Sequence, residues 1–186
     1  GMYFGAQHQQ CVEGWFQNVP GLKIVMPATA ADAKGLLKTA IRDDDPVLFL
    51  ESKQCLFLVG EVPEEEYTIP FGQARVAKEG TDVTIIAIQS MLFPALEVAE
   101  ELENKGISVE VIDPRTIVPL DKETICTSAR KTGRVIVVHE APIRGGVGAE
   151  IASVITENCF KDLKYPVRRI GALNVPIPFG PAEEFV

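Results

Sequence analysis

Short apolar runs alternate with amphipathic segments over most of this chain. In the second half the runs are Val83–Ile88, Val109–Ile112 and Val135–Val138. Runs of this kind are typical of strands that are covered on both faces of a sheet. Apolar residues at helical spacing predict helices over Met91–Lys105, Asp121–Lys131 and Val147–Phe160. The alternation predicts an α/β fold with a mostly parallel sheet and helices on both of its faces.

The first third of the chain shows the same alternation on a smaller scale. Strands are expected at Leu22–Met26 and Val47–Leu50, with a helix between them that Thr29 caps. The apolar face of this helix is formed by Ala33, Leu36, Leu37, Ala40 and Ile41. Residues 52–70 are polar, acidic and interrupted by prolines, which is typical of a linker. We therefore expect domains at 1–60 and 72–186, joined by a linker at 61–71.

Signals at the ends of the later elements support this organisation. Asp121 is a suitable N-cap, and Gly106 and Gly133 are suitable residues to end helices. An edge strand is expected at Ala74–Lys78 and a last short strand at Val167–Ile170. The second domain is therefore expected to contain a mostly parallel sheet with helices on both faces.

Composition narrows the class of function. The chain has 186 residues, of which 46% are hydrophobic and 24% charged, as in globular domains. Its formal net charge of −8 argues against nucleic acid or an anionic membrane as the main partner and suits a basic protein. No apolar run approaches the roughly 20 residues of a membrane span. The widely spaced cysteines indicate reduced, buried thiols and not a disulfide framework or a zinc site.

Three successive aspartates, Asp43 to Asp45, follow the expected end of the first helix. A helix C-terminus carries partial negative charge and leaves carbonyl groups unpaired, so acids there are unfavourable. A bound cation would reverse the balance, because carbonyl and carboxylate oxygens form a site for a hard cation. A solvated acidic turn, partly neutralised by Arg42, is the other interpretation and the more frequent outcome for a run of charge.

Histidine and glycine mark further positions with possible chemistry. His8 lies among glutamines, and an imidazole exchanges protons near neutral pH, although a structural role is the commoner one. His139–Glu140 ends an expected core strand, where side chains can face a ligand, or where a hydrogen-bonded histidine can lie at a domain seam. Arg144–Gly148 enters an expected helix, where anions can bind. A tight glycine turn is the better explanation, because the spacing matches neither common phosphate-binding motif.

Several of these segments resemble one known family. The first group is Gly5–Gln10, Pro20–Pro27, Asp32–Leu37 and Ala40–Asp43; the second is Val111–Ile117, His139–Pro142 and Pro176–Phe179. They resemble the beta subunit of 2-oxo acid dehydrogenases, the thiamine-diphosphate-dependent, decarboxylating first component of the pyruvate and branched-chain (2-oxoisovalerate) complexes. The resemblance covers nearly the whole chain, in order. It corresponds to the later part of such a subunit, without its first segment and its C-terminal tail.

The resemblance implies roles for particular residues. Residues 1–60 would be the tail of a pyrimidine-binding domain, and 72–186 a transketolase-type C-terminal domain with three α/β/α layers. His8 would face the cofactor and the substrate and take part in proton transfer or in binding the 2-oxo acid. Potassium ligands would be provided by Ala40, Ile41, Asp43 and Asp45. Gln9 departs from the serine that the family usually has after the histidine, which bears on how His8 is positioned.

The resemblance also implies cofactors, partners and an activity. Thiamine diphosphate would be shared with an alpha subunit that holds the diphosphate and magnesium, so no cofactor-binding residue is assigned here. The other expected partners are a second beta subunit and the subunit-binding domain of the dihydrolipoyl acyltransferase. The expected reaction of the heterotetramer is oxidative decarboxylation of a 2-oxo acid with acyl transfer to lipoamide. The isolated chain is expected to be inactive, and the expected location is the cytoplasm or the mitochondrial matrix.

Two alternatives belong to other classes. The chain could be a non-catalytic module for dimerisation and for docking to the acyltransferase. It could also be part of a transketolase or a deoxyxylulose-phosphate synthase. The segment around His8 and the loop Ala40–Asp45 favour the two-subunit dehydrogenases.

Overall fold

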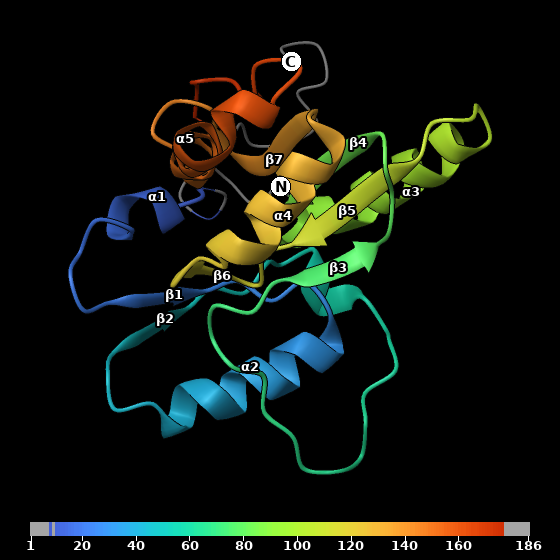
Figure 1. Ribbon diagram of the computed structural model, residues 1–186. Coiled ribbons are helices and arrows are strands. Elements are labelled where there is room, and N and C mark those ends of the chain that lie inside the picture. Colours follow the sequence, from blue (N-terminus) through green and yellow to red (C-terminus); the bar gives the residue numbers. More distant parts are fainter. Residues whose placement is uncertain (1–7, 9, 177–186) are drawn as a thin grey trace.

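Two sheets organise the chain in a computed structural model that describes residue 8 and residues 10–176 (Figure 1). The smaller sheet consists, in spatial order, of β2 (Val47–Phe49), β1 (Lys23–Val25) and β6 (Thr116–Val118). The larger sheet consists, in spatial order, of β3 (Arg75–Lys78), β5 (Val109–Asp113), β4 (Val83–Ala87), β7 (Val135–Pro142) and β8 (Arg168–Ala172). Only β3 runs antiparallel to its neighbour in the larger sheet. The predicted mostly parallel sheet and the edge position of β3 are confirmed.

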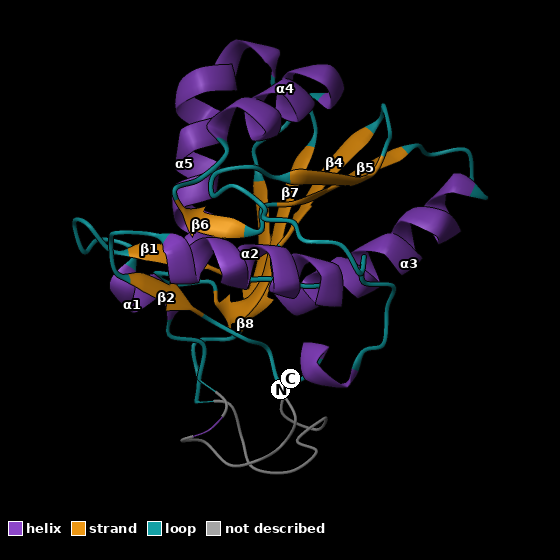
Figure 2. Cartoon of the chain, turned by 90° about the horizontal axis from the view of Figure 1, so that it is seen from below, coloured by secondary structure: helices purple, strands orange, loops and turns teal. Residues whose placement is uncertain are grey.

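Helices cover both faces of the larger sheet, as Figure 2 shows. Ile86 of β4 packs in one apolar cluster with α4 (Lys122–Thr132) and α5 (Val147–Cys159). Its neighbours Ile85 and Ala87 pack in a second cluster with α3 (Leu92–Glu103). Successive side chains of a strand point to opposite faces, so a continuous apolar run fills both layers. The predicted α/β/α layering is therefore confirmed.

The predicted caps are present. The Thr29 hydroxyl accepts a hydrogen bond from the Asp32 N–H at 3.1 Å at the start of α2 (Ala30–Arg42). Asp121 accepts one from the Thr124 N–H at 3.0 Å at the start of α4. Gly133 ends α4 with a φ of +69°, a conformation that glycine adopts without strain.

The stretch that follows β2 is held along α2. It contains a short 3-10 helix, η2 (Cys55–Phe57), and is otherwise irregular. The Tyr67 hydroxyl donates to the Ala31 carbonyl at 2.7 Å, and the Thr39 hydroxyl donates to the Ile69 carbonyl at 2.7 Å. A Cβ at Gly35 would lie 2.6 Å from the Ile69 side chain, so this position requires glycine. The predicted linker is therefore fixed to the first helix over much of its length.

The two halves of the chain share the smaller sheet. β6 comes from the later half and is antiparallel to β1, with Ile24 opposite Val118. The Met26 N–H donates to the Arg115 carbonyl at 2.9 Å beyond the end of this pairing. Neither β6 nor the one-turn helix α1 (Glu13–Phe16) is predicted from the sequence. The division into 1–60, 61–71 and 72–186 stays a prediction, and one sheet crosses it.

A buried network of charges lies at this junction. Asp32 of α2 is 2% exposed and Asp113 of β5 is 0% exposed. The Arg115 guanidinium lies 2.7 Å from the Asp32 carboxylate, and Arg75 lies 3.5 Å from Asp32 and 3.3 Å from Asp113. The pKa of Asp113 is raised to about 6, chiefly by burial and also by the neighbouring charge of Asp32, against the effect of the arginines. We call Asp32, Arg75, Asp113 and Arg115 the junction network.

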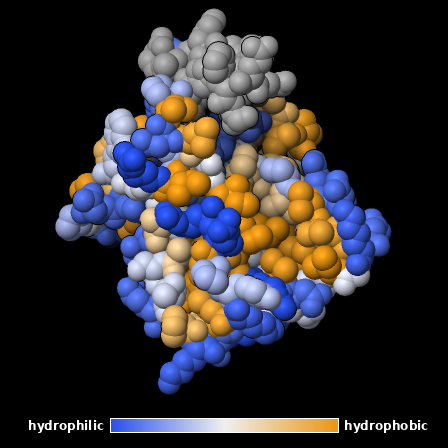
Figure 3. All heavy atoms as spheres, turned by 90° about the horizontal axis from the view of Figure 1, so that it is seen from above, coloured by the Kyte–Doolittle hydropathy of each residue, from blue (hydrophilic) through white to orange (hydrophobic). Residues whose placement is uncertain are grey.

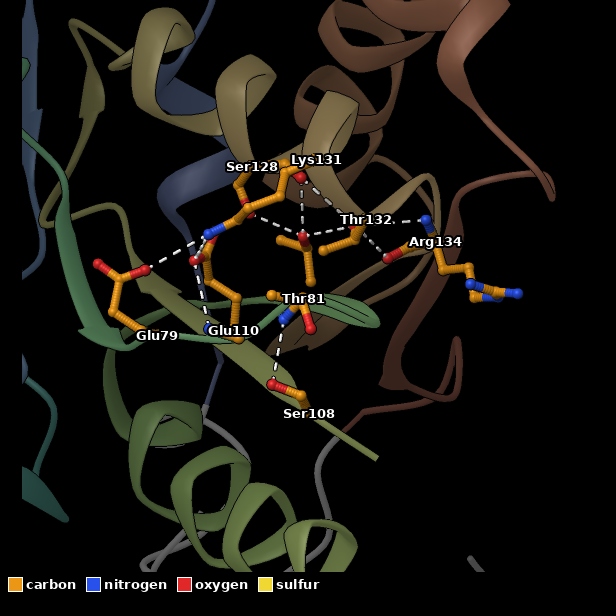
Figure 4. A network of polar contacts seen from close by, with 10 residues as sticks. Glu79, Thr81, Ser108, Glu110, Ser128, Lys131, Thr132 and Arg134 are labelled. Carbon is orange, nitrogen blue, oxygen red and sulfur yellow. Dashed lines mark hydrogen bonds and ion pairs between the residues drawn. The ribbon is translucent and has the colours of Figure 1, made fainter. Parts of the chain in front are cut away.

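A second network lies within the later half (Figure 4). The ammonium of Lys131 on α4 contacts the Glu110 carboxylate of β5 and lies 3.4 Å from Glu79. Glu110 is 2% exposed. Burial raises the pKa of Glu110, but hydrogen bonds from Lys131 and Ser128 outweigh burial, so that the pKa lies below its usual value. We call Glu79, Glu110 and Lys131 the α4 network.

Some apolar side chains remain at the surface. Figure 3 shows them gathered in a broad patch between charged side chains on one face. Among the exposed apolar residues, Phe57 of η2 is 72% exposed and Val59, just after η2, is 101% exposed. No helix within residues 10–176 is long and apolar enough to cross a membrane.

Candidate active site at the junction of the two sheets

A cavity of about 150 Å³ lies where strands of both sheets end. Its walls follow β1, β2 and β4 and include part of β7, and carboxyl ends of strands are the usual place for ligands in α/β sheets. The lining residues are His8, Gln10, Cys11, Val12, Glu13, Met26, Leu50, Glu51, Ser52, Lys53, Gln54, Gln89 and Glu140. The cavity therefore joins segments that lie far apart in the sequence.

His8 is exposed and lines this cavity. The Lys53 ammonium donates to the His8 backbone carbonyl at 2.8 Å, which ties the histidine segment to the chain beyond β2. A histidine beside a cavity of carboxylates has the surroundings that proton exchange requires. The structure thus gives His8 a suitable place, and its catalytic role stays a prediction.

Glu13 and Cys11 line the cavity together with His8, and the sequence does not predict their place there. Glu13 of α1 is 4% exposed. Burial raises the pKa of Glu13, and the nearby charge of Glu140 raises it further, against its own backbone N–H. The pKa of the Cys11 thiol is raised to about 12, chiefly by burial and also by the charges of Glu13 and Glu140. No sequence pattern points to them, because a one-turn helix has too few residues to show a period.

The later half contributes Gln89 and Glu140. Gln89 begins the 3-10 helix η3 (Gln89–Met91) with a φ of +54°, and its amide donates to the Leu50 carbonyl at 2.6 Å. Such a φ is uncommon for a residue with a side chain and is found preferentially at functional sites. The Ser90 hydroxyl donates to the Glu140 carboxylate at 2.6 Å. Glu140 lines the cavity from within β7, which continues to Pro142, so the strand does not end at His139–Glu140 as expected, and a ligand-facing role for Glu140 stays a prediction.

His139 has a different environment from Glu140. It is 2% exposed, and neither ring nitrogen makes a hydrogen bond to another described residue. Burial lowers the pKa of His139, with the Ala141 backbone acting against burial. A Cβ at Gly146 or Gly148 would lie 2.6 Å from the imidazole ring. The glycines of Arg144–Gly148 therefore let the entry of α5 pack on His139, which agrees with the predicted glycine turn.

The aspartates after α2 are paired with a lysine from β1. The Lys23 ammonium lies 2.7 Å from Asp43 and 3.0 Å from Asp45. These contacts lower the pKa of Asp43, chiefly through the hydrogen bond from Lys23. Arg42 instead pairs with Glu66 at 2.7 Å, so neutralisation by Arg42 is not what the structure shows. Ala40 and Ile41 lie in the last turn of α2, and the Ala40 carbonyl accepts a hydrogen bond from the Asp43 N–H at 3.4 Å.

Metal-ligating side chains do not gather elsewhere in the described residues. No group of three or more His, Cys, Asp or Glu within residue 8 and residues 10–176 is arranged to hold a metal ion. The four cysteines are free thiols, of which Cys126 and Cys159 are buried and Cys11 and Cys55 half-buried. The prediction of reduced thiols agrees with this arrangement, and full burial holds for two of them.

Two family comparisons divide the chain at the same stretch. Residues 4–57 match the pyrimidine-binding domain of transketolase, and residues 72–186 match the transketolase C-terminal domain. The chain therefore belongs to the transketolase C-terminal domain family. A solved structure described as "Split gene transketolase, inactive beta4 tetramer" has the same fold, with a TM-score of 0.79 and 33% identity over 96% of this chain and 56% of that one.

The curated relatives define the branch of the family. The beta subunit of 2-oxoisovalerate dehydrogenase of Bacillus subtilis (strain 168) is 47% identical over 99% of this chain and 57% of its own length. The beta subunit of acetoin:2,6-dichlorophenolindophenol oxidoreductase of the same organism is 45% identical, over 99% and 54%. The mitochondrial pyruvate dehydrogenase E1 beta subunit of Dictyostelium discoideum is 46% identical, over 94% and 50%. The chain spans about half the length of these relatives. The resemblance inferred from the motifs is confirmed.

Proposed function

We propose that this chain forms part of the beta subunit of a thiamine-diphosphate-dependent 2-oxo acid dehydrogenase of the pyruvate or 2-oxoisovalerate type. The observation that carries the proposal is the match to such beta subunits over both parts of the chain, at 46–47% identity. The whole enzyme would decarboxylate a 2-oxo acid and pass the acyl group to lipoamide. Its location would follow its relatives, which in Dictyostelium discoideum are named mitochondrial.

The cavity indicates which part of the cofactor this chain would serve. Thiamine diphosphate supplies the carbanion chemistry when it is bound. Pockets that bind small molecules usually have volumes of about 300 Å³ or more. This cavity, at about 150 Å³, is smaller. Its lining includes Glu13, Glu51 and Glu140, which would repel a diphosphate. The residues of this cavity therefore do not suit the diphosphate, and we assign that group and magnesium to an alpha subunit.

His8 is the residue of this chain that we assign to the reaction. It would hold or move a proton at an imidazole nitrogen on the face shared with the alpha subunit. The further partners we propose are a second beta subunit and the subunit-binding domain of the acyltransferase. The net charge of −8 suits a basic partner domain.

Potassium is the second ion of the proposal. The carbonyls of Ala40 and Ile41 with the carboxylates of Asp43 and Asp45 form an oxygen-only set, which suits a hard monovalent cation. Lys23 already contacts both carboxylates. A potassium ion would therefore have to share these oxygens with an ammonium group.

A second candidate is a two-chain transketolase. The fold match to a split-gene transketolase favours it, although the 33% identity is lower than the 47% of the dehydrogenase relative. Assays with 2-oxo acids and with sugar phosphates distinguish the two. A purely structural docking module would be inactive in both assays when assembled.

The test uses the full-length subunit assembled with its alpha partner. His8→Ala should lower turnover by about a hundredfold or more, as expected for a positioned acid-base group. Thiamine diphosphate binding and unfolding should change little, because His8 is exposed. Asn18→Ala, at an exposed residue outside the cavity, is the control and should keep near-normal turnover. Full activity in an assembled His8→Ala enzyme would contradict the assignment.

A further inference from the structure

Gln89 is one of two residues other than glycine that have a positive φ in the part of the chain that the structure describes; the other is Arg115. Both contact the wall of the cavity from the later half of the chain. The Gln89 amide donates to the Leu50 carbonyl at 2.6 Å, and the Arg115 carbonyl accepts from the Met26 N–H at 2.9 Å. Leu50 and Met26 both line the cavity. A backbone conformation of this kind persists only where its surroundings hold it, and here both instances lie against one wall.

The two neighbours of Gln89 are held by β7. The Ile88 N–H donates to a β7 carbonyl at 3.0 Å, and the Ser90 hydroxyl donates to the carboxylate of Glu140, also in β7, at 2.6 Å. The turn from β4 into η3 therefore falls on Gln89. Its side chain is buried and reaches Leu50, just beyond the end of β2 in the smaller sheet. The Gln89 amide thus forms a bridge between the two sheets.

The bridge ends on a continuous part of the cavity wall. Residues 50–54 all line the cavity, and we call them the wall segment. At its start, the Leu50 N–H donates to the Val25 carbonyl at 2.9 Å, which continues the pairing of β1 with β2. Near its end, the Lys53 ammonium donates to the His8 carbonyl at 2.8 Å. The wall segment therefore connects the amide bridge with the backbone of His8.

We propose that Gln89 is a positioning residue for His8, which it holds in place through the wall segment. This inference rests on the proposed function, in which His8 holds or moves a proton. An acid-base group must lie within hydrogen-bond reach of the proton that it transfers, and a misplacement of about 1 Å lowers the rate strongly. The hydrogen bonds of Gln89 to Leu50 and of Lys53 to His8 are the contacts that carry the position from η3 to the histidine.

Hydrogen exchange in this chain tests the bridge without any enzymatic activity. Opening of the wall segment breaks the bond from the Gln89 amide, so the peptide that contains Leu50 should exchange faster without it. The expected increase is up to about tenfold, the size of one hydrogen bond. Gln89→Leu removes the amide and keeps a similar size. Gln89→Gly also removes it and adopts a positive φ without strain, so it serves the same test if Gln89→Leu does not fold.

The matched control lies at the other end of β4. Thr84 is fully buried, and its hydroxyl contacts those of Ser128 and Thr132 at 2.7 Å and 2.9 Å. Thr84→Val should lower the stability of the whole chain with no preferential effect on the wall segment. The proposal is overturned if the Gln89 variants speed the exchange of the wall segment no more than that of the rest of the chain. The pairing with β1 would then be enough to hold the segment.

The link to His8 is tested in the full-length subunit assembled with its alpha partner. Gln89→Leu should lower turnover by about tenfold with little change in KM. The same substitution should have no further effect in a His8→Ala background, because nothing is left to position. A merely structural role predicts the same fold loss in both backgrounds, which would contradict the role of Gln89 alone. Full activity of His8→Ala would instead contradict the proposed function, and the role of Gln89 with it.

Discussion

The junction network and the α4 network contain the same kinds of charged residue, but the pKa of the buried β5 carboxylate is shifted in opposite directions in the two. Each buries a β5 carboxylate, Asp113 in one and Glu110 in the other, beside cationic side chains. Yet the pKa of Asp113 is raised to about 6, with burial as the largest cause, and that of Glu110 is lowered. The difference lies in the neighbours. Asp113 shares Arg75 with a second buried carboxylate, Asp32, whereas the carboxylate that shares Lys131 with Glu110 is that of Glu79, which is 80% exposed.

This contrast shows that the pKa of a buried carboxylate depends on how its cationic partner is shared with other carboxylates. A cation that is shared by two buried carboxylates compensates each of them less than a cation whose second carboxylate is exposed to water. The side-chain nitrogens Nε of Arg75 and Arg115 are buried and make no hydrogen bond to a described residue. The junction network is therefore incompletely satisfied, while the α4 network is compensated. The junction is where a change of charge should have the larger consequence.

Removal of Asp32 should give the largest effect. Asp32→Ala leaves Arg115 without its 2.7 Å partner in a buried site. Breaking a buried ion pair from one side costs about 3–5 kcal/mol of the free energy of unfolding. Urea unfolding measures this change, with exposed Asp44→Ala as a control expected within about 0.5 kcal/mol. Equal midpoints for the two variants would show that the junction network contributes no stability.

Neutralising Glu110 should cost less, because its partner can reach water. Glu110→Gln replaces a charged hydrogen bond to Lys131, whose side chain is 37% exposed. We expect a loss of about 1.5–3 kcal/mol in urea unfolding. The matched control is Glu103→Gln, whose carboxylate pairs with Lys78 at 63% exposure and should contribute about 1 kcal/mol or less. A smaller loss for Glu110→Gln than for Glu103→Gln would contradict the ranking.

The pH dependence of stability tests the comparison further. The contribution of Asp113 to the free energy of unfolding should fall as the pH rises, and that of Glu110 should fall as the pH drops. The folded pKa of Asp113 is raised, so its contribution is complete at low pH and is lost as the pH rises through about 6. The difference in unfolding free energy between the parent chain and Asp113→Asn should therefore fall from pH 4 to pH 7, by up to about 1.4 kcal/mol per pH unit. The folded pKa of Glu110 is lowered, so its contribution is lost as the pH falls. Parallel pH curves for the parent and Asp113→Asn would rule out the raised pKa.

The partly exposed group of Lys23, Asp43 and Asp45 should give the smallest effect. If potassium binds at Ala40, Ile41, Asp43 and Asp45, it should raise the melting temperature above that in an equal concentration of a bulky organic cation. Lys23→Met should enlarge this difference, because the ammonium then no longer competes for Asp43. Asp43→Ala should abolish it. If the melting temperatures in the two salts are identical, for the parent and for Lys23→Met, the chain binds no potassium here. The aspartates would then be paired with Lys23 alone.

Local patterns predicted most of the fold. The caps Thr29 and Asp121 and the glycine stop at Gly133 are visible in the sequence, because each acts within about four residues of its element. β6 is not visible, because it is three residues long and its partner β1 lies about ninety positions earlier. The antiparallel direction of β6 depends on that distant partner as well. Short strands defined by tertiary pairing therefore escape prediction.

The candidate site shows the same limit. His8 and Glu140 could be proposed, because histidine is rare here and a strand end is a recognisable place. Glu13 could not, because its burial depends on a loop more than a hundred residues later, which Gly14 contacts. The pairing of Lys23 with Asp43 was also missed, because the residues are 20 positions apart and meet only when β1 lies beside the end of α2. Contacts of this kind become visible only in the folded chain.

The antiparallel pairing of β6 with β1 bears on whether two separately produced halves of this chain would associate. A cut in the acidic stretch Glu64–Glu66 would leave two polypeptides, each holding strands of the smaller sheet. Separation would expose an unpaired edge of β1, which favours reassociation over release. Two separately encoded halves should therefore reassemble when they are produced together. Because β6 of the later half pairs with β1 of the first half, this chain is suited to fragment complementation. The break would lie in the acidic stretch between the two halves.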